Sequence, residues 1–478
     1  MQPLTETQSR AGSLRHQHPR FTYDSVSCER VGDELKLRFK FSAGAGIRFE
    51  PETTIGSIDQ SRIDSIDPGV LRRLAFHLGL TEMLSYWKAT CSPEIVVRAG
   101  SLTSDQVAWW KDLIIRGMGE FFYVNQIDFT HPGFLNITAD AEGDGSAYYD
   151  GSASARTLVL SSGGKDSALT LQVLREAGTD FNCLMLNPLP AAAALVSEAG
   201  RHSPIIVRRT IDPRLLELNK LGYLNGHTPF SALLSFLGVA CAVLFDYGRV
   251  IVSNERSSNE GNVEFLGAQV NHQYSKTFDF EQTFREYSRR YLAAGVDYFS
   301  LLRPLYEIQI IRMIAGYPKF LPIFKSCNRN QLEGTWCGRC PKCISVFTLF
   351  YPFLAKEELI RTFGVDFFEG ADAIPLLKQL AGSEGHKPFE CVGTHEETMA
   401  ALFLGVQRAR KEQREMPAAL RFVEQEILPR HPEAAGLSQS VLSAWSSEHN
   451  LPVEYERLLQ RHLKLESRID ERELPRKA

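Results

Sequence analysis

Residues Ser162-Gly163-Gly164-Lys165-Asp166-Ser167 form a glycine-rich stretch whose position in the chain decides the fold. The stretch follows the apolar run Thr157–Leu160 and leads into an amphipathic segment, Ser167–Ala177. Small residues at such a turn let backbone N–H groups approach a phosphate, and the N-terminus of the following helix favours an anion. The sequence therefore predicts a strand–loop–helix unit that binds phosphate, with Lys165 as a mobile cation.

The loop is not of the Walker A type, which needs a first glycine where Val159 stands. The hydroxyls of Ser162 and Ser167 can donate hydrogen bonds to a phosphate, and Asp166 can hold Mg²⁺ or position the loop. The alternative is a glycine-rich turn without a ligand. The strand-like and helix-like segments on its two sides favour the phosphate loop.

Beyond the loop, short apolar runs alternate with segments of helical periodicity. The runs Phe181–Leu186, Pro204–Val207 and Arg249–Ser253 have the length and composition of buried strands. Helices are indicated between them, ending with the apolar segment Phe230–Phe245. This alternation predicts an α/β fold with a parallel sheet and helices on both faces.

Changes in composition divide the chain into five predicted parts. These are a disordered tail (1–20), an N-terminal α+β domain (21–139), a linker rich in Gly, Ser and Asp (140–155), an α/β domain (156–395), and a helical C-terminal region with a polar tail (396–478). The α+β interpretation rests on strand-like alternation in Glu34–Phe41 and on helical periodicity over about 70–88 and about 104–122.

Composition and charge narrow the class of protein. The 478 residues carry a net charge of -4, which argues against a protein that coats nucleic acid. The longest apolar run, Phe230–Phe245, is shorter than the roughly 20 residues that a membrane helix needs, so no membrane insertion is expected. Residues 1–20 lack the apolar core of a secretory signal, although their Ser/Arg bias is also compatible with a transit peptide. With nine cysteines and no secretory signal, a cytoplasmic location is predicted.

Four of those cysteines have the spacing of a metal site. Cys337, Cys340 and Cys343 form two overlapping CxxC motifs, and Cys327 lies upstream. Four thiolates can surround a tetrahedral Zn²⁺ and leave no open position for catalysis, which favours a structural zinc. An Fe–S cluster would use the same ligands, and free thiols or a disulfide pair are further alternatives.

Polar clusters stand where strand ends and connections are expected. In open α/β sheets ligands bind at the carboxyl ends of the strands, and the cluster 254–257 directly follows the strand-like run Arg249–Ser253. Each cluster alone is compatible with ordinary loop capping, but six in one half of the chain favour a site. They are Asn225–Pro229, Ser253–Ser257, Asn271–Lys276, Arg303-Pro304, Ser326–Asn330 and His386–Cys391.

The loop resembles the Ser-Gly-Gly-x-Asp-Ser signature of the PP-loop ATP pyrophosphatases, in which it grips the β- and γ-phosphates of ATP while an oxygen nucleophile attacks the α-phosphate. The clusters resemble the MurL family of UDP-N-acetylmuramoyl-L-alanyl-L-glutamate epimerases, which act in peptidoglycan synthesis. The resemblance spans roughly residues 20 to 450 and includes runs in the N-terminal part. It is carried by Ser85–Lys88, Gly117–Phe121, Ser253–Ser257, Val270–Lys276, Ser300–Leu305, Ser326–Asn330, Trp336–Cys343 and His386–Gly393.

This resemblance implies a PP-loop ATP-binding catalytic domain over 156–395. It also implies ATP- and Mg²⁺-dependent inversion of the terminal L-glutamate of UDP-MurNAc-L-Ala-L-Glu through an acyl-adenylate. Ser162 to Ser167 would hold the nucleotide, although the family can carry glycine where Ser162 stands. The candidates for binding the substrate's diphosphate and carboxylates are Arg256, Lys276, Arg303 and Arg329. The candidates for the epimerising acid and base are His227, Glu255, His272 and Cys391.

Two other enzyme classes share parts of this pattern. A PP-loop ligase would adenylate a carboxylate in the same way and then join it to an amine or ammonia. A tRNA-modifying sulfur or nitrogen transferase is disfavoured, because the chain is mildly acidic and lacks a long basic stretch.

Overall fold

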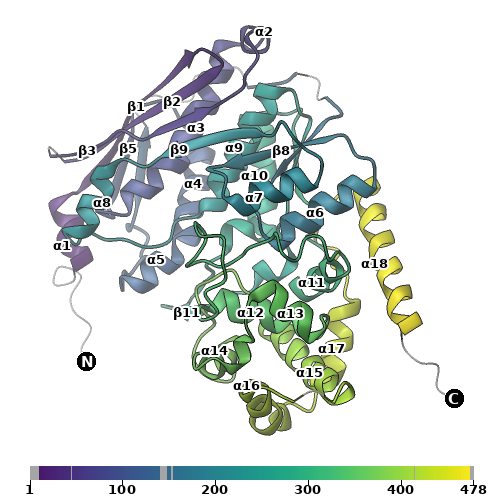
Figure 1. The fold of residues 1–478 in the computed structure, drawn as a ribbon. Helices are drawn as coiled ribbons and strands as arrows, with labels where there is room; N and C mark the ends of the chain where they lie inside the picture. Colours follow the sequence, from purple (N-terminus) through teal and green to yellow (C-terminus); the bar gives the residue numbers. More distant parts are fainter. Residues whose placement is uncertain (1–9, 45, 140–147, 152–153, 414, 474–478) are drawn as a thin grey trace.

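One mixed sheet runs through most of the molecule (Figure 1). The computed structural model describes residues 10–44, 46–139, 148–151, 154–413 and 415–473. Across the sheet the order is β13-β10-β7-β8-β9-β4-β2-β1-β5-β6, with β3 paired to β2. In chain order its strands are β1 (Arg20–Val31), β2 (Glu34–Ala43), β3 (Ile47–Phe49), β4 (Glu52–Ile55), β5 (Glu94–Val97), β6 (Asn136–Ala139), β7 (Thr157–Leu160), β8 (Phe181–Leu186), β9 (Ile205–Thr210), β10 (Arg249–Val252) and β13 (Asp297–Ser300).

The half of the sheet that carries the glycine-rich loop is parallel. Its first strand, β7, lies in the middle; the chain places β8 and β9 on one side and then β10 and β13 on the other. The direction of winding therefore reverses between β7 and β10. In open α/β sheets the crevice outside such a reversal is the usual ligand site. The predicted α/β class is confirmed, and the loop after β7 lies at this reversal.

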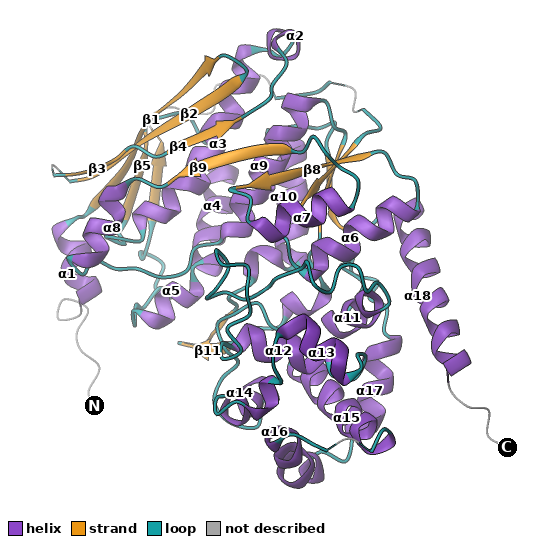
Figure 2. Cartoon of the chain, viewed as in Figure 1, coloured by secondary structure: helices purple, strands orange, loops and turns teal. Residues whose placement is uncertain are grey.

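Helices cover both faces of the parallel strands, as Figure 2 shows. Side chains alternate along each strand, so that Leu158 of β7 joins one hydrophobic core and its neighbour Val159 joins the other. The first core includes α3 (Pro68–Trp87), α9 (Phe230–Phe245) and α10 (Phe278–Tyr291). The second includes α6 (Lys165–Glu176), α7 (Pro190–Glu198), α11 (Glu307–Ala315) and α12 (Pro341–Phe350). The parallel half of the sheet is thus buried between two layers of helices, as the alternating pattern indicated.

The N-terminal strands extend the same sheet. β1 and β2 pair antiparallel, and β4 pairs antiparallel with β9, with Ile55 opposite Val207. The parts predicted as 21–139 and 156–395 therefore contribute to one continuous sheet. The remaining helices of this region are α2 (Gln60–Asp64), α4 (Ser104–Gly117), α5 (Gly119–Val124) and α8 (Pro213–Lys220).

Helices gather around α12 in the C-terminal part, shown green to yellow in Figure 1. They are α13 (Lys356–Phe363), α14 (Ala373–Leu380), α15 (His395–Lys411), α16 (Ala418–Phe422) and α17 (Ala434–Ser443). The last helix, α18 (Val453–Glu473), lies apart from this group, returns to the sheet and packs beside α6. Tyr455 of α18 lies within hydrogen-bonding distance of Thr157 at the start of β7, with 3.2 Å between the two hydroxyl oxygens.

The predicted disordered tail over residues 1–20 is wrong from Arg10 onward. Helix α1 (Arg10–Gln17) buries Ala11 and Leu14. Its Arg15 donates hydrogen bonds to the carbonyl oxygens of Cys91 (2.6 Å) and Phe134 (2.7 Å), which ties the segment to the sheet. Residues 1–9 and most of the predicted linker, 140–147 and 152–153, lie outside the described residues.

The apolar helix α9 is buried, in agreement with the sequence. Twelve of its residues, from Ala232 to Leu244, are buried. Among the residues that the structure describes, no helix combines the length and the apolar character that a membrane span requires.

Candidate active site

The glycine-rich loop forms an open turn between β7 and α6. Gly164 is the N-cap of α6 and, as a glycine, leaves the first amides of this helix without a side-chain cap. Gly163 has φ +87°, and a Cβ at this position would lie 2.6 Å from the backbone nitrogen of Ala192. The amide of Ser162 donates to the Ser167 hydroxyl at 3.1 Å. This arrangement leaves a helix N-terminus that can bind an anion.

Lys165 lies in a buried cluster of charges. Its side chain is 1% exposed, and its Nζ lies 2.6 Å from Asp166 Oδ1 and 2.8 Å from Glu307 Oε1. Lys342 reaches the same Glu307 oxygen from α12, at 3.0 Å. Burial alone would raise the pKa of Glu307, but Lys165 and Lys342 hold it at about 2. Glu307 and Lys342 were not among the predicted site residues.

Glu255 lies at the end of β10, on the other side of the reversal. Its side chain is buried, and burial, together with the nearby Asp166 carboxylate, raises its pKa to about 7. Lys276 and Lys165 act in the opposite direction on the same pKa. Glu255 therefore borders both the phosphate loop and the next cluster of side chains.

That next cluster contains the other three predicted acid–base residues. Lys276 Nζ lies 3.1 Å from Cys391 Sγ, and His272 hydrogen-bonds to Cys391 and to Glu120. The ring of His227 lies 4.2 Å from that of His272, between centroids, and its Nδ1 is 3.7 Å from Glu120. Glu120 belongs to α5 in the N-terminal part, so this cluster brings four distant segments together.

Electrostatics in this cluster favour a thiolate. Burial alone would raise the pKa of Cys391, but Lys276 and His272 lower it to about 5. Burial would lower the pKa of His272, but Cys391 and Glu120 raise it to about 9. The pKa of His227 is lowered to about 3, chiefly by burial and then by His272. At neutral pH we therefore expect a thiolate beside a protonated His272, with His227 neutral.

The reactivity of Cys391 provides a direct check. Because its pKa is about 5, we expect the rate of alkylation by iodoacetamide to change less than about twofold between pH 6.5 and 8.5. An ordinary thiol has a pKa of about 8.5, and below that pH its alkylation rate would rise roughly tenfold with each unit of increasing pH. Lys276→Met removes the adjacent ammonium, so alkylation at pH 7 should fall by about tenfold or more.

Peptide-level mass spectrometry would follow each cysteine separately. Cys28 is an internal reference, because burial raises its pKa to about 11. Lys356→Met, on the exposed start of α13, is a matched control and should leave the alkylation of Cys391 unchanged. A tenfold rise per pH unit at Cys391 of the unaltered protein would contradict the thiolate assignment.

The predicted substrate-binding cations separate into different environments. Arg256 lies over the ring of Tyr306, 4.4 Å from its centroid, and Arg329 is exposed. Lys276 contacts Cys391, as described above. Arg303 is 1% exposed, and its guanidinium is engaged by Glu281 and by the backbone oxygens of Glu255 and Lys276. These contacts favour a role for Arg303 in holding the loops of the site over direct contact with a substrate.

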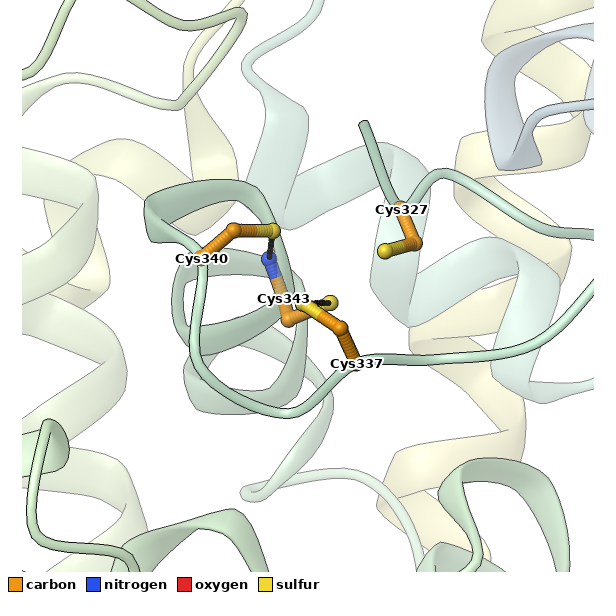
Figure 3. A group of neighbouring side chains, drawn as sticks. All are labelled: Cys327, Cys337, Cys340 and Cys343. Carbon is orange, nitrogen blue, oxygen red and sulfur yellow. Dashed lines mark hydrogen bonds between the residues drawn. The ribbon is translucent and has the colours of Figure 1, made fainter. Parts of the chain in front are cut away.

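The four predicted metal-ligating cysteines meet at the start of α12 (Figure 3). The sulfur atoms of Cys327, Cys337, Cys340 and Cys343 all lie within 4.8 Å of one another, and those of Cys337 and Cys343 are 3.8 Å apart. Tetrahedral coordination with Zn–S bonds of about 2.3 Å would place sulfurs about 3.8 Å apart. Backbone amides of Asn330 and Cys343 point to the sulfurs of Cys327 and Cys340. This group can hold a metal ion.

The cysteine group is connected directly to the charged site. Lys342, between Cys340 and Cys343, extends to Glu307, and its backbone amide donates to Glu390 at 2.7 Å. Glu390 immediately precedes Cys391. An ion held by the cysteines would therefore stabilise the segments that position Lys342 and Cys391.

The fold and the site define a mixed α/β protein with a largely buried, charged site at the carboxyl edge of its parallel strands. The chain belongs to the MurL family: the MurL N-terminal domain matches residues 13–301 and the MurL C-terminal domain matches residues 323–435. This division places every strand of the main sheet in the first domain and all four cysteines of the metal-binding group in the second.

Three curated relatives carry the same name, UDP-N-acetyl-alpha-D-muramoyl-L-alanyl-L-glutamate epimerase. The protein of a Micromonospora species is 32% identical over 92% of this chain and 97% of its own length. That of Xanthomonas oryzae pv. oryzae is 34% identical over 78% and 83% of the two chains. That of Salinispora tropica is 37% identical over 80% and 84%. The similarity therefore covers more than four fifths of each relative.

Proposed function

We propose that this chain inverts the terminal L-glutamate of UDP-MurNAc-L-Ala-L-Glu to D-glutamate, using ATP and releasing AMP and diphosphate. The names of the relatives support the substrate and the inversion. The observation that carries the proposal is the continuity of one charged site. It extends from the loop at Lys165, through Glu255 and Lys276, to the thiol of Cys391.

The nucleotide part of the proposal rests on the loop and its place in the sheet. In a PP-loop domain, the strand β7, the turn of Gly163 and Gly164, and the uncapped start of α6 would receive the β- and γ-phosphates. Lys165 would add positive charge, the hydroxyls of Ser162 and Ser167 would donate hydrogen bonds, and Asp166 would hold the Mg²⁺ that accompanies ATP.

Adenylation gives a physical reason for the use of ATP. A free carboxylate resists loss of its α-proton, because the product would carry two negative charges. Joining the glutamyl carboxylate to AMP removes one charge and makes the carbonyl a better electron acceptor. Arg256 and Arg329 are proposed to bind the substrate's diphosphate and carboxylates.

Incubation with UDP-MurNAc-L-Ala-L-Glu, ATP and Mg²⁺ in D₂O tests this function. We expect deuterium at the glutamate α-carbon, with AMP and diphosphate formed. Release of ADP would contradict the adenylation step. A condensed product that needs an added amine, without α-deuteration, would identify a ligase instead.

We further propose that the four cysteines hold a structural Zn²⁺. Four thiolates leave no position for a reacting water, so the ion would support the fold around Lys342 and Cys391. Mass spectrometry of metals should find about one zinc per chain in the unaltered protein. Cys340→Ser should lose this zinc and lower the melting temperature. Cys241→Ser, at a buried thiol of α9, is a control that should retain the metal. Iron with an absorbance band of an Fe–S cluster would contradict zinc.

A further inference from the structure

We propose that Cys391 and Glu255 transfer the α-proton on opposite faces of the substrate's glutamyl carbon, and that Lys276 lies between them to stabilise the enolate oxygen. This inference rests on the proposed function, because it takes the adenylated glutamate as the reacting group. It assigns two of the four acid–base candidates to the chemical step and makes the two histidines positioning residues.

The thiol side is built to hold a base. The ammonium of Lys276 donates a hydrogen bond to Cys391 Sγ at 3.1 Å, and His272 also hydrogen-bonds to this sulfur. His272 is in turn held by Glu120 through its Nδ1. His272 therefore links Glu120 to Cys391 and orients the thiolate. The ring of His227 packs against that of His272 at an angle of 43°, and its Nδ1 lies 3.7 Å from Glu120, so His227 supports the arrangement.

The carboxyl side is built to hold an acid. Glu255 is 6% exposed and begins the 3-10 turn Arg256–Asn259 after β10. Burial and the Asp166 carboxylate raise the pKa of Glu255 to about 7, so a sizeable fraction of this carboxyl group is protonated near neutral pH. Glu255 and Cys391 come from different segments, and both interact electrostatically with the ammonium of Lys276. A carbonyl oxygen bound by that ammonium would therefore have both the thiolate and the carboxyl group close to it.

One buried arginine, Arg303, holds the backbone of both Glu255 and Lys276 in place. Arg303 donates to the backbone oxygen of Glu255 at 2.9 Å and to that of Lys276 at 2.6 Å. The hydroxyl of Ser258 donates toward the same two oxygens, at 2.7 and 3.0 Å. The spacing between Glu255 and Lys276 is thus determined by a rigid, buried network. Such rigidity is what proton transfer at a defined carbon requires.

The proposed step balances as follows. The Cys391 thiolate takes the α-proton, the C–H bond breaks, and its electron pair moves onto the carbonyl oxygen beside Lys276. Protonated Glu255 gives its proton to the opposite face of the same carbon, which forms a new C–H bond and leaves a carboxylate. Cys391 is then a thiol, and exchange of protons with water restores the starting state. Reaction in the other direction uses the two groups in reversed roles.

The assignment of Cys391 and Glu255 to opposite faces is tested by measuring exchange of the glutamate α-hydrogen separately for each epimer of the substrate. In D₂O with ATP and Mg²⁺, we expect Cys391→Ser and Glu255→Gln each to slow epimerisation by about 100- to 10,000-fold. Each variant should still exchange the α-hydrogen of one epimer, L-Glu or D-Glu, and the two variants should retain opposite epimers. Lys276→Met should slow exchange with both epimers. Cys28→Ser and Glu264→Gln, at a half-buried and an exposed position outside the site, are the matched controls.

Release of diphosphate separates this inference from the proposed function. If the unaltered protein releases none, the adenylation itself is wrong. The pairing alone is overturned if both variants lose exchange with the same epimer, or if either one keeps exchange with both. It is also overturned if Glu255→Gln abolishes diphosphate release, because Glu255 would then belong to the nucleotide site.

Discussion

Replacing Lys165 by methionine is expected to lower diphosphate release by about 100- to 1,000-fold, the cost of removing one preorganised group that stabilises charge in a transition state. The ammonium of Lys165 is held without freedom to move by Asp166 and Glu307. Burial opposes the charge on Lys165, but these two carboxylates raise its pKa above the ordinary value, so the cation persists at any working pH. A fixed cation at the start of α6 is suited to the charge that develops on the departing diphosphate.

A double variant shows whether Lys165 stabilises the departing diphosphate or only balances the charge of Glu307. Lys165→Met leaves Glu307 paired with Lys342 only, which could itself disturb the site. Combining Lys165→Met with Glu307→Gln removes the buried negative charge as well. Diphosphate release should stay low in the double variant. Recovery of most of the activity would instead show that Lys165 serves only to balance Glu307. Lys319→Met, at a surface ion pair with Glu198, is the matched control.

Elements with strong local signals could be predicted closely from the sequence. The runs Thr157–Leu160, Phe181–Leu186 and Phe230–Phe245 form β7, β8 and α9 at those residues. Each is bounded by turn residues, and its apolar pattern depends only on neighbours in the chain. The cysteine group was found for the same reason, because its spacing is a local property of the sequence.

Pairings between distant segments could not be predicted in this way. The antiparallel pairing of β4 with β9 joins residues about 150 positions apart, and periodicity carries no information about such partners. The helix α1 was missed because a short polar segment forms a helix here through burial and through the contacts of Arg15.

The acidic partners in the site were missed for a related reason. Glu120 and Glu307 each stand in the first turn of a helix, α5 and α11. Acidic residues are common there because they interact favourably with the helix dipole, so a single one gives no sign of a further role. Glu120 lies within the run Gly117–Phe121 that carried the family resemblance, and this was the available signal. The internal contacts of Arg303 could not be predicted either, because a sequence does not reveal which partners a guanidinium has.

Replacing Arg303 by methionine should destabilise the protein by about 3–5 kcal/mol, the range for removing one partner of a buried ion pair. Glu281, which is 1% exposed, would lose its charged partner and keep the amide of Asn450, at 3.0 Å from its other oxygen. The backbone oxygens of Glu255 and Lys276 would also lose a donor. The loss of stability is measured from the shift in the midpoint of urea unfolding, with the dependence of the unfolding free energy on urea concentration held constant.

A second substitution tests whether the loss comes from the uncompensated charge. Glu281→Gln added to Arg303→Met removes that charge, so the double variant should recover part of the stability. The two sites should then show a coupling energy of about 0.5–3 kcal/mol. If Arg303→Met instead changes stability by less than about 1 kcal/mol and mainly raises KM for the muramoyl dipeptide, Arg303 contacts the substrate as the sequence first indicated. Because its donors are already occupied by Glu281 and by the loops that carry Glu255 and Lys276, we expect the loss of stability.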